Sequence, residues 1–113
     1  ESYRKYFKNF DVQFNLENKN FFNGCWATTI VISKKYKKNT KTLMKILSDK
    51  KLPVRPFFLP LSSMKPFYNK FSIKKNRTAY DIYKRGLTLP SALNLKKNQI
   101  AMYSDAIKSI LDS

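Results

Sequence analysis

Apolar side chains recur at helical spacing in two long segments of the chain. Within residues 40–51, four apolar residues fall on one side of a helix and the lysines fall elsewhere. Pro53 disfavours helical geometry at the residue before it, so this helix is expected to end near residue 51. A second apolar stripe, from Ile100 to Leu111, predicts a final helix over about residues 96–111.

Three other segments have the pattern of strands. Residues 26–32 are rich in β-branched side chains and apolar on both faces, which predicts a central strand. Residues 54–59 are expected to be extended, and Pro56 favours a sheet edge because it has no amide hydrogen to donate. A brief strand is expected at Leu87–Leu89, ended by Pro90.

The remaining segments are shorter. Residues 1–9 have aromatic side chains on one helical face, and we expect them to be the tail of a longer helix. Residues 62–71 form an aromatic-rich loop or short helix. A further short helix starts at Asn76 or Thr78 and ends at Gly86, because glycine tolerates the left-handed conformation beyond a helix. The order predicts an α+β fold, a small, mostly antiparallel sheet with helices on one face.

Composition excludes several kinds of chemistry. A length of 113 residues corresponds to one small domain, and the single cysteine allows no intrachain disulfide. Cys25 is expected to be buried as a small hydrophobe. Histidine is absent, which excludes triads and zinc sites that use it. The sequence has neither the roughly 20 apolar residues of a membrane helix nor an apolar signal core, so a cytoplasmic protein is expected.

The net charge of +16 comes from 23 basic and 7 acidic residues. Three interpretations remain open: a bias toward A+T-rich codons, a phosphate-bearing ligand, or a nucleic-acid partner. The basic run at residues 34–38 is read as a solvated turn, with a nucleic-acid patch as the alternative. The acidic residues form no close pair, and no glycine-rich phosphate loop is present. The chain alone therefore has no convincing catalytic set and no metal cage.

Two motifs in order carry a family resemblance. The first is Lys-Leu-Pro-Val-Arg-Pro-Phe-Phe-Leu-Pro-Leu-Ser at residues 51–62, and the second is Gly-Leu-Thr-Leu-Pro at residues 86–90. Together they resemble the C-terminal domain of the DegT/DnrJ/EryC1/StrS family of nucleotide-sugar aminotransferases, and residues 54–57 are most similar to perosamine-synthase-type members. The resemblance implies that residues 1–9 end an interdomain helix, that residues 10–113 are the small domain, and that the large domain is absent.

The resemblance also implies an activity for the complete enzyme. A large domain would hold pyridoxal phosphate, and glutamate would supply an amino group to the keto carbon of a nucleotide-linked sugar. The small domain would close over the cofactor in a homodimer and would be inactive alone. The identities of the sugar and nucleotide, and the choice between transamination and the cofactor-dependent dehydration of a family subset, stay open. The alternative from a different class is a basic nucleic-acid-binding module.

Three residues are expected to contact the substrate. Arg55 carries a fork of donors suited to phosphate or carboxylate, with an ordinary exposed strand arginine as the alternative. Ser62 occupies the position at which many family members have a histidine that lines the sugar-nucleotide pocket. Tyr68 is expected in the pocket wall, as is Phe57, for which core packing is the favoured alternative. No catalytic or metal-ligating residue is assigned to this chain.

Overall fold

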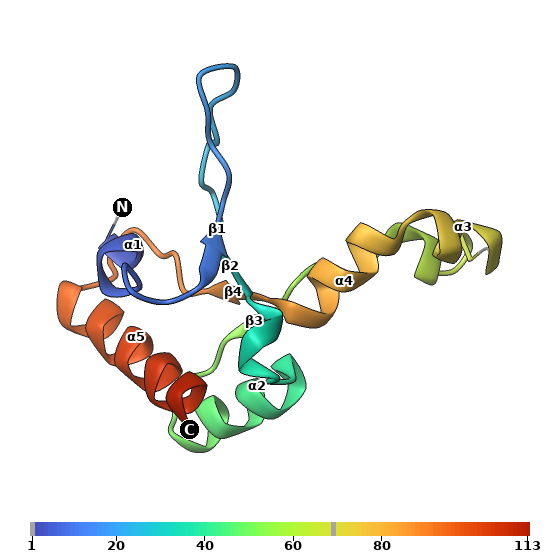
Figure 1. The fold of residues 1–113 in the computed structure, drawn as a ribbon. Coiled ribbons are helices and arrows are strands. Elements are labelled where there is room, and N and C mark those ends of the chain that lie inside the picture. The colour runs from blue at the N-terminus through green and yellow to red at the C-terminus, as the bar shows by residue number, and fades with distance from the viewer. Residues whose placement is uncertain (1, 69) are drawn as a thin grey trace.

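An antiparallel sheet of four strands lies at the centre of the computed structural model, which describes residues 2–68 and 70–113. The strand order is β1-β2-β4-β3 (Figure 1). The two inner strands are therefore β2, which was predicted to be central, and β4, and the strand containing Pro56 lies at the edge, as predicted. The strand bounds are β1 Val12–Phe14, β2 Thr28–Ile32, β3 Arg55–Pro56 and β4 Gly86–Leu89.

Three helices pack on one face of this sheet (Figure 1). They are α1 (Ser2–Tyr6), α2 (Thr40–Asp49) and α5 (Lys97–Asp112). The side-chain oxygen of Asn39 caps α2 by accepting a hydrogen bond from the amide of Lys41 at 2.9 Å.

The hydrophobic core lies between these helices and the sheet. Alternate residues of β2 and β4 face it, because neighbouring side chains of a strand point to opposite faces. The two longer helices contribute the facing apolar stripe, as their spacing predicted. The α+β prediction, with helices on one face, is confirmed. The most deeply buried core side chains are Ile30, Ile32, Leu43, Leu47, Leu87 and Ile107.

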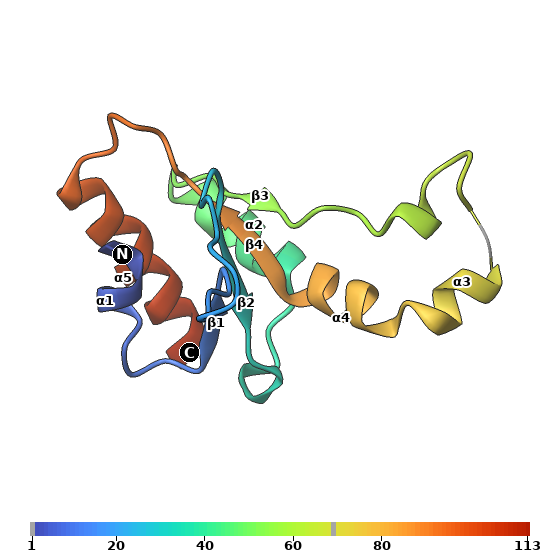
Figure 2. The ribbon, with the colours of Figure 1, turned by 90° about the horizontal axis from the view of Figure 1, so that it is seen from above.

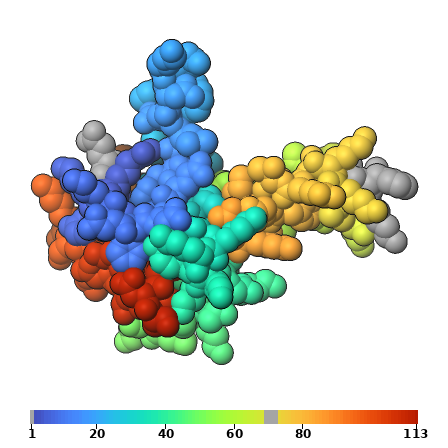
Figure 3. All heavy atoms as spheres, in the orientation of Figure 1, coloured from blue at the N-terminus to red at the C-terminus, as the bar shows by residue number. Residues whose placement is uncertain are grey.

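Two segments project from this body. The first, which we call the hairpin, is the connection between β1 and β2 over residues 15–27. The second, the long arm, covers residues 57–85 and returns through α3 (Lys70–Lys75) and α4 (Arg77–Arg85). They leave the body in different directions, and the space-filling view shows both as separate projections (Figures 1 and 3). In the view from above, the outgoing segment after β3 runs beside α4 (Figure 2).

Short 3-10 turns shape two of the connections. The turn η1 (Lys34–Tyr36) follows β2, and η2 (Leu61–Ser63) lies in the outgoing segment of the long arm. Residues 34–38 thus form a compact turn whose start is capped by the side chain of Ser33.

Two expectations for the start of the central strand are wrong. Cys25 is exposed and has a left-handed backbone with φ of 47°. The side chain of Asn23 accepts a hydrogen bond from the Cys25 amide at 2.8 Å, which makes this segment a turn. The strand begins only at Thr28, so Trp26 precedes it, with 79% of its surface exposed.

Gly86 ends α4 as predicted, but for a different reason. Its φ is −92°, in extended backbone, and it is the first residue of β4. A Cβ atom at this position would lie 2.8 Å from the carbonyl oxygen of Ile82 and 2.9 Å from the Cβ and Cγ of Phe57. Glycine is therefore required here by the close approach of the outgoing segment of the long arm, and not by a left-handed cap.

Candidate substrate-binding face

Arg55 lies on the edge strand β3, paired with Thr88 of β4. Its side chain is exposed, and among the described residues no acidic side chain lies within salt-bridge distance of it. It lines a concave pocket of about 350 Å³ together with Trp26, Thr88 and Ser91. A guanidinium group without an acidic partner in a pocket is suited to bind a phosphate or carboxylate from a ligand.

Trp26 forms an aromatic wall beside this arginine. Its ring lies 5.9 Å from the ring of Phe58, tilted by 42°. The root of the hairpin is held in place because the amide of Thr28 donates a hydrogen bond of 2.8 Å to the Ser91 hydroxyl. The ring lies where the hairpin meets the long arm, and most of its surface is available for stacking.

The sequence analysis did not assign Trp26 to the site. The alternation of side chains predicted that the central strand begins at residue 26, which would place the Trp26 ring on one face of the sheet. The neighbouring pair Gly24 and Cys25 was the available signal, since small residues before an aromatic one also fit a turn that exposes it.

Ser62 lies in η2, inside the long arm, and is 8% exposed. Its hydroxyl is hydrogen-bonded to the hydroxyl of Tyr80 on α4 at 3.0 Å. The neighbouring Ser63 hydroxyl donates to the carbonyl of Pro60 at 2.7 Å. Ser62 thus joins the two sides of the long arm in this conformation.

Tyr68 lies farther along the long arm and is 55% exposed. Neither Tyr68 nor Ser62 lines the pocket around Arg55. Phe57 is half-buried against Gly86, in line with the packing alternative. The residues that were expected to contact the substrate therefore lie in one continuous segment of the chain, but they do not line the same pocket. These residues are Arg55, Ser62 and Tyr68.

The other arginine beside the sheet has a structural partner. Arg85 donates hydrogen bonds to the carboxylate of Asp81 and, at 2.6 Å, to the carbonyl of Ile32. The hydrogen bonds from Arg85, together with Lys34 at 3.2 Å, lower the pKa of the Asp81 carboxyl to about 2. Arg85 is therefore neutralised within the fold, whereas Arg55 is not.

The side chains that the structure describes form neither a site for a nucleophilic lysine nor a site for a metal ion. None of the lysines whose side-chain burial the structure describes is buried, so none of these sits in an apolar environment of the kind that activates an amine as a nucleophile. Within residues 2–68 and 70–113, no group of three histidine, cysteine, aspartate or glutamate side chains converges on a point that could hold a metal. No described helix is both long and apolar enough to cross a bilayer.

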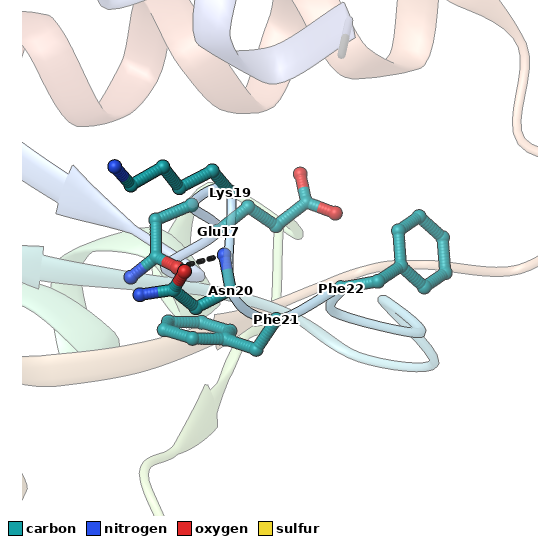
Figure 4. A pocket seen from close by; sticks show the side chains of 6 residues that line it. Glu17, Lys19, Asn20, Phe21 and Phe22 are labelled. Atoms are coloured by element: carbon teal, nitrogen blue, oxygen red, sulfur yellow. Dashed lines mark hydrogen bonds between the residues drawn. The ribbon is translucent and has the colours of Figure 1, made fainter.

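The tip of the hairpin exposes large aromatic side chains. Phe21 is 48% exposed and Phe22 is 87% exposed, and their rings point in different directions from a hollow of about 420 Å³ (Figure 4). The turn is held by the Asn20 amide, which donates to the Asn18 side chain at 2.8 Å. This tip therefore carries apolar surface that the body of the chain does not cover.

The long arm exposes more apolar surface. Six large apolar side chains of its outgoing segment are at least 41% exposed. Exposed apolar patches of this extent mark surfaces that bind a partner or a ligand. These side chains are Phe58, Leu59, Leu61, Met64, Phe67 and Tyr68.

Comparison with known proteins agrees with the two motifs. The model of the DegT/DnrJ/EryC1/StrS aminotransferase family matches residues 1–108. A GDP-perosamine synthase of Escherichia coli O157:H7 is 30% identical over 96 residues, which are 85% of this chain and 25% of that protein. The chain thus spans about a quarter of the length of the curated relative it matches.

Proposed function

Because the chain belongs to the DegT/DnrJ/EryC1/StrS aminotransferase family, we propose that it is the C-terminal domain of a nucleotide-sugar aminotransferase. The complete enzyme would transfer an amino group from glutamate to the keto carbon of a nucleotide-linked sugar. The observation in the structure that supports this role best is the exposed Arg55, which lies in a pocket with an aromatic wall and has no acidic partner among the described residues.

Arg55 would bind the phosphate groups of the substrate. Its several N–H donors match phosphate oxygens, and charge-assisted hydrogen bonds of this kind are among the stronger ones in proteins. Trp26 would stack against the flat or apolar part of the same molecule. Tyr68 would approach the sugar farther along the long arm, where its hydroxyl group can donate and accept hydrogen bonds. The Ser62 hydroxyl would reach the sugar only by exchanging its hydrogen bond with Tyr80.

The hairpin and the long arm would pack against the remainder of the enzyme. Both segments expose aromatic side chains, and burial of each one in an interface would stabilise the packing by roughly 1.5–3 kcal/mol. Pyridoxal phosphate does not fit the side chains that the structure describes, because none of the lysines among them is buried to form its Schiff base. The cofactor would be held by the large domain of a cytoplasmic homodimer, and this chain alone would be inactive.

The proposed ligand face can be tested through its own tryptophan. Trp26 is the only tryptophan of the chain, so its fluorescence reports on this pocket alone. Titration with a GDP-linked sugar is expected to quench it with saturation, and the Arg55→Gln variant should lose about tenfold or more in affinity. Equal affinity of the Arg55→Gln variant and the unaltered chain would overturn the role of Arg55.

The enzyme class can be tested in the full-length product of the coding sequence. A large α/β domain with a lysine that forms a Schiff base with pyridoxal phosphate is expected upstream. The product should then convert a nucleotide-linked keto sugar to the amino sugar with glutamate as donor. A full-length product that binds no pyridoxal phosphate would contradict the proposal, and conversion of the sugar without incorporation of nitrogen would indicate dehydration instead.

A further inference from the structure

A second pocket lies on the Pro56 side of the edge strand. Consecutive residues of a strand point to opposite faces, so Pro56 faces away from the pocket that contains Arg55. The second pocket has a volume of about 530 Å³ and lies between the start of α2 and the end of α4. This volume falls within the range of roughly 300–1,000 Å³ that is typical of small-molecule sites.

Positive charge gathers around this pocket without neutralisation. The one arginine that lines it, Arg85, is already paired with the carboxylate of Asp81. Four further lysines line it, and none of them forms a salt bridge with a described residue, while the Lys38 ammonium donates a hydrogen bond of 3.3 Å to the Ser113 hydroxyl. These lysines are Lys37, Lys38, Lys41 and Lys84.

Like charges around one hollow repel one another, and this cost is relieved when an anion binds between them. The lysines are exposed or half-buried and reach the pocket from two separate segments of the chain. The general excess of lysine in this sequence does not by itself bring four unpaired ones to a single concavity. A ligand that complements the positive charge of this pocket would therefore be an anion.

The floor of the pocket is held in a fixed shape. Thr40 is 6% exposed, and its hydroxyl donates a hydrogen bond of 2.9 Å to the carbonyl of Lys84. This bond ties the first turn of α2 to the last turn of α4. Lys37 has a left-handed backbone, with φ of 50°, which turns the chain from η1 toward α2. The two segments that carry the lysines, residues 37–41 and the end of α4, are thus held beside each other.

One side of the pocket is apolar. Met44, Pro56 and Tyr83 line it beside the lysines, and Met44 and Tyr83 are half-buried. A ligand with both a charged and a flat or apolar part would fill such a site. An extended nucleic-acid strand would instead require a row of exposed aromatic side chains along a basic groove.

We propose that this pocket binds a small phosphate-bearing molecule, with its phosphate groups between the four lysines and its apolar part against Met44 and Tyr83. The site is separate from the face that contains Arg55, and it stands or falls independently of the proposed aminotransferase role. Nucleotides and free pyrophosphate share the chemistry that the pocket recognises, and they are distinguished by the apolar wall.

The test uses calorimetric titration of the full chain with inorganic pyrophosphate and with ADP. We expect saturable binding of both, with ADP the tighter ligand because its base can contact the apolar wall. The double variant Lys41→Gln, Lys84→Gln should bind both about tenfold or more weakly. The matched control is Lys45→Gln, Lys50→Gln, which removes the same charge from α2 and its C-terminal cap outside the pocket and should change binding by less than about twofold.

Four results would overturn the proposal. The first is the absence of saturable binding by the unaltered chain, and the second is an equal loss in the two double variants, which would show that only total charge matters. The third is tight binding of single-stranded RNA with a steep salt dependence and no binding of pyrophosphate, which would indicate a nucleic-acid surface. Loss of pyrophosphate binding in Arg55→Gln, with retention in Lys41→Gln, Lys84→Gln, would place the anion on the Arg55 face and leave the proposed function standing.

Discussion

The hydroxyl groups of Ser62 and Tyr80 lie 3.0 Å apart and join the outgoing and returning sides of the long arm. Ser62 is buried, so its hydroxyl has given up most of its contact with water. A buried hydroxyl stabilises the fold only while it has a hydrogen-bond partner, because without one the loss of its hydration is not compensated. The shape of the long arm therefore depends on this pair.

Tyr80→Phe should loosen the long arm. The substitution leaves the Ser62 hydroxyl unpaired, and we expect a loss of about 1–2 kcal/mol in the free energy of unfolding. Urea denaturation measures the loss, and limited proteolysis should show faster cleavage within residues 57–85. Tyr83→Phe is the matched control, because among the described residues the Tyr83 hydroxyl makes no hydrogen bond. Equal proteolysis of the two variants would show that the pair does not hold the long arm.

Gly86→Ala should destabilise the junction between α4 and β4. The added methyl group would meet the Ile82 carbonyl and the ring base of Phe57 at 2.8–2.9 Å, and neither can rotate away. Overpacking of this kind costs about 1–3 kcal/mol. The control is Gly24→Ala, where no atom lies within 4 Å of the added methyl group. If urea denaturation gave the same stability for both variants, the close approach at Gly86 would not be the reason for glycine there.

The carboxylate of Asp81 should make stability depend on pH in the acid range. Its pKa in the folded chain is about 2, below the ordinary 3.8, so its contribution is present above about pH 4 and is lost as the pH falls toward 2. Asp81→Asn should lower the free energy of unfolding at pH 7 by about 1 kcal/mol. The whole pKa shift would imply a larger loss, but water screens this side chain, which is 35% exposed.

The measurement is urea denaturation of the unaltered chain and of Asp81→Asn between pH 7 and pH 3. Their difference should be largest at neutral pH and should shrink as the pH falls. Asp105→Asn serves as the control, because Asp105 is 66% exposed and pairs only with Lys108 on the same helix. A difference that stays constant over this range would mean that the Arg85 and Lys34 contacts do not stabilise the ionised carboxylate.

Arg55→Gln should weaken substrate binding in the full-length enzyme. If Arg55 contacts the phosphate groups, we expect KM for the nucleotide sugar to rise about tenfold or more, with little change in KM for glutamate. Lys45→Gln, which removes the same charge from the exposed side of α2, should leave both constants within about twofold. Steady-state kinetics with each substrate varied in turn measures this. A rise in KM for glutamate alone would assign Arg55 to the amino donor.

Local patterns were sufficient to predict the body of the fold. The apolar stripes of α2 and α5 and the β-branched run of β2 lie in the core as expected, because burial of one face dictates the periodicity of such segments. The edge position of Pro56 was also predicted correctly, since a missing amide hydrogen restricts where a proline can pair.

The projections and the pocket around Arg55 were predicted less well. Trp26 was placed in a strand and Cys25 was expected to be buried, whereas the turn at Asn23 leaves Trp26 outside the strand and Cys25 exposed. The reason for Gly86 and the pairing of Ser62 with Tyr80 depend on which segments approach one another in the long arm. Such contacts arise between residues far apart in the chain, and no local pattern encodes them.

Hydrogen–deuterium exchange tests most directly whether the hairpin and the long arm are surfaces for the rest of an enzyme. The amides of residues 15–27 and 57–68 would be compared in the isolated chain and in the full-length product under identical conditions. Burial of Phe22, Trp26 and the apolar side chains of the long arm predicts much slower exchange of both segments in the full-length product. Unchanged exchange in both segments would contradict their role as docking surfaces.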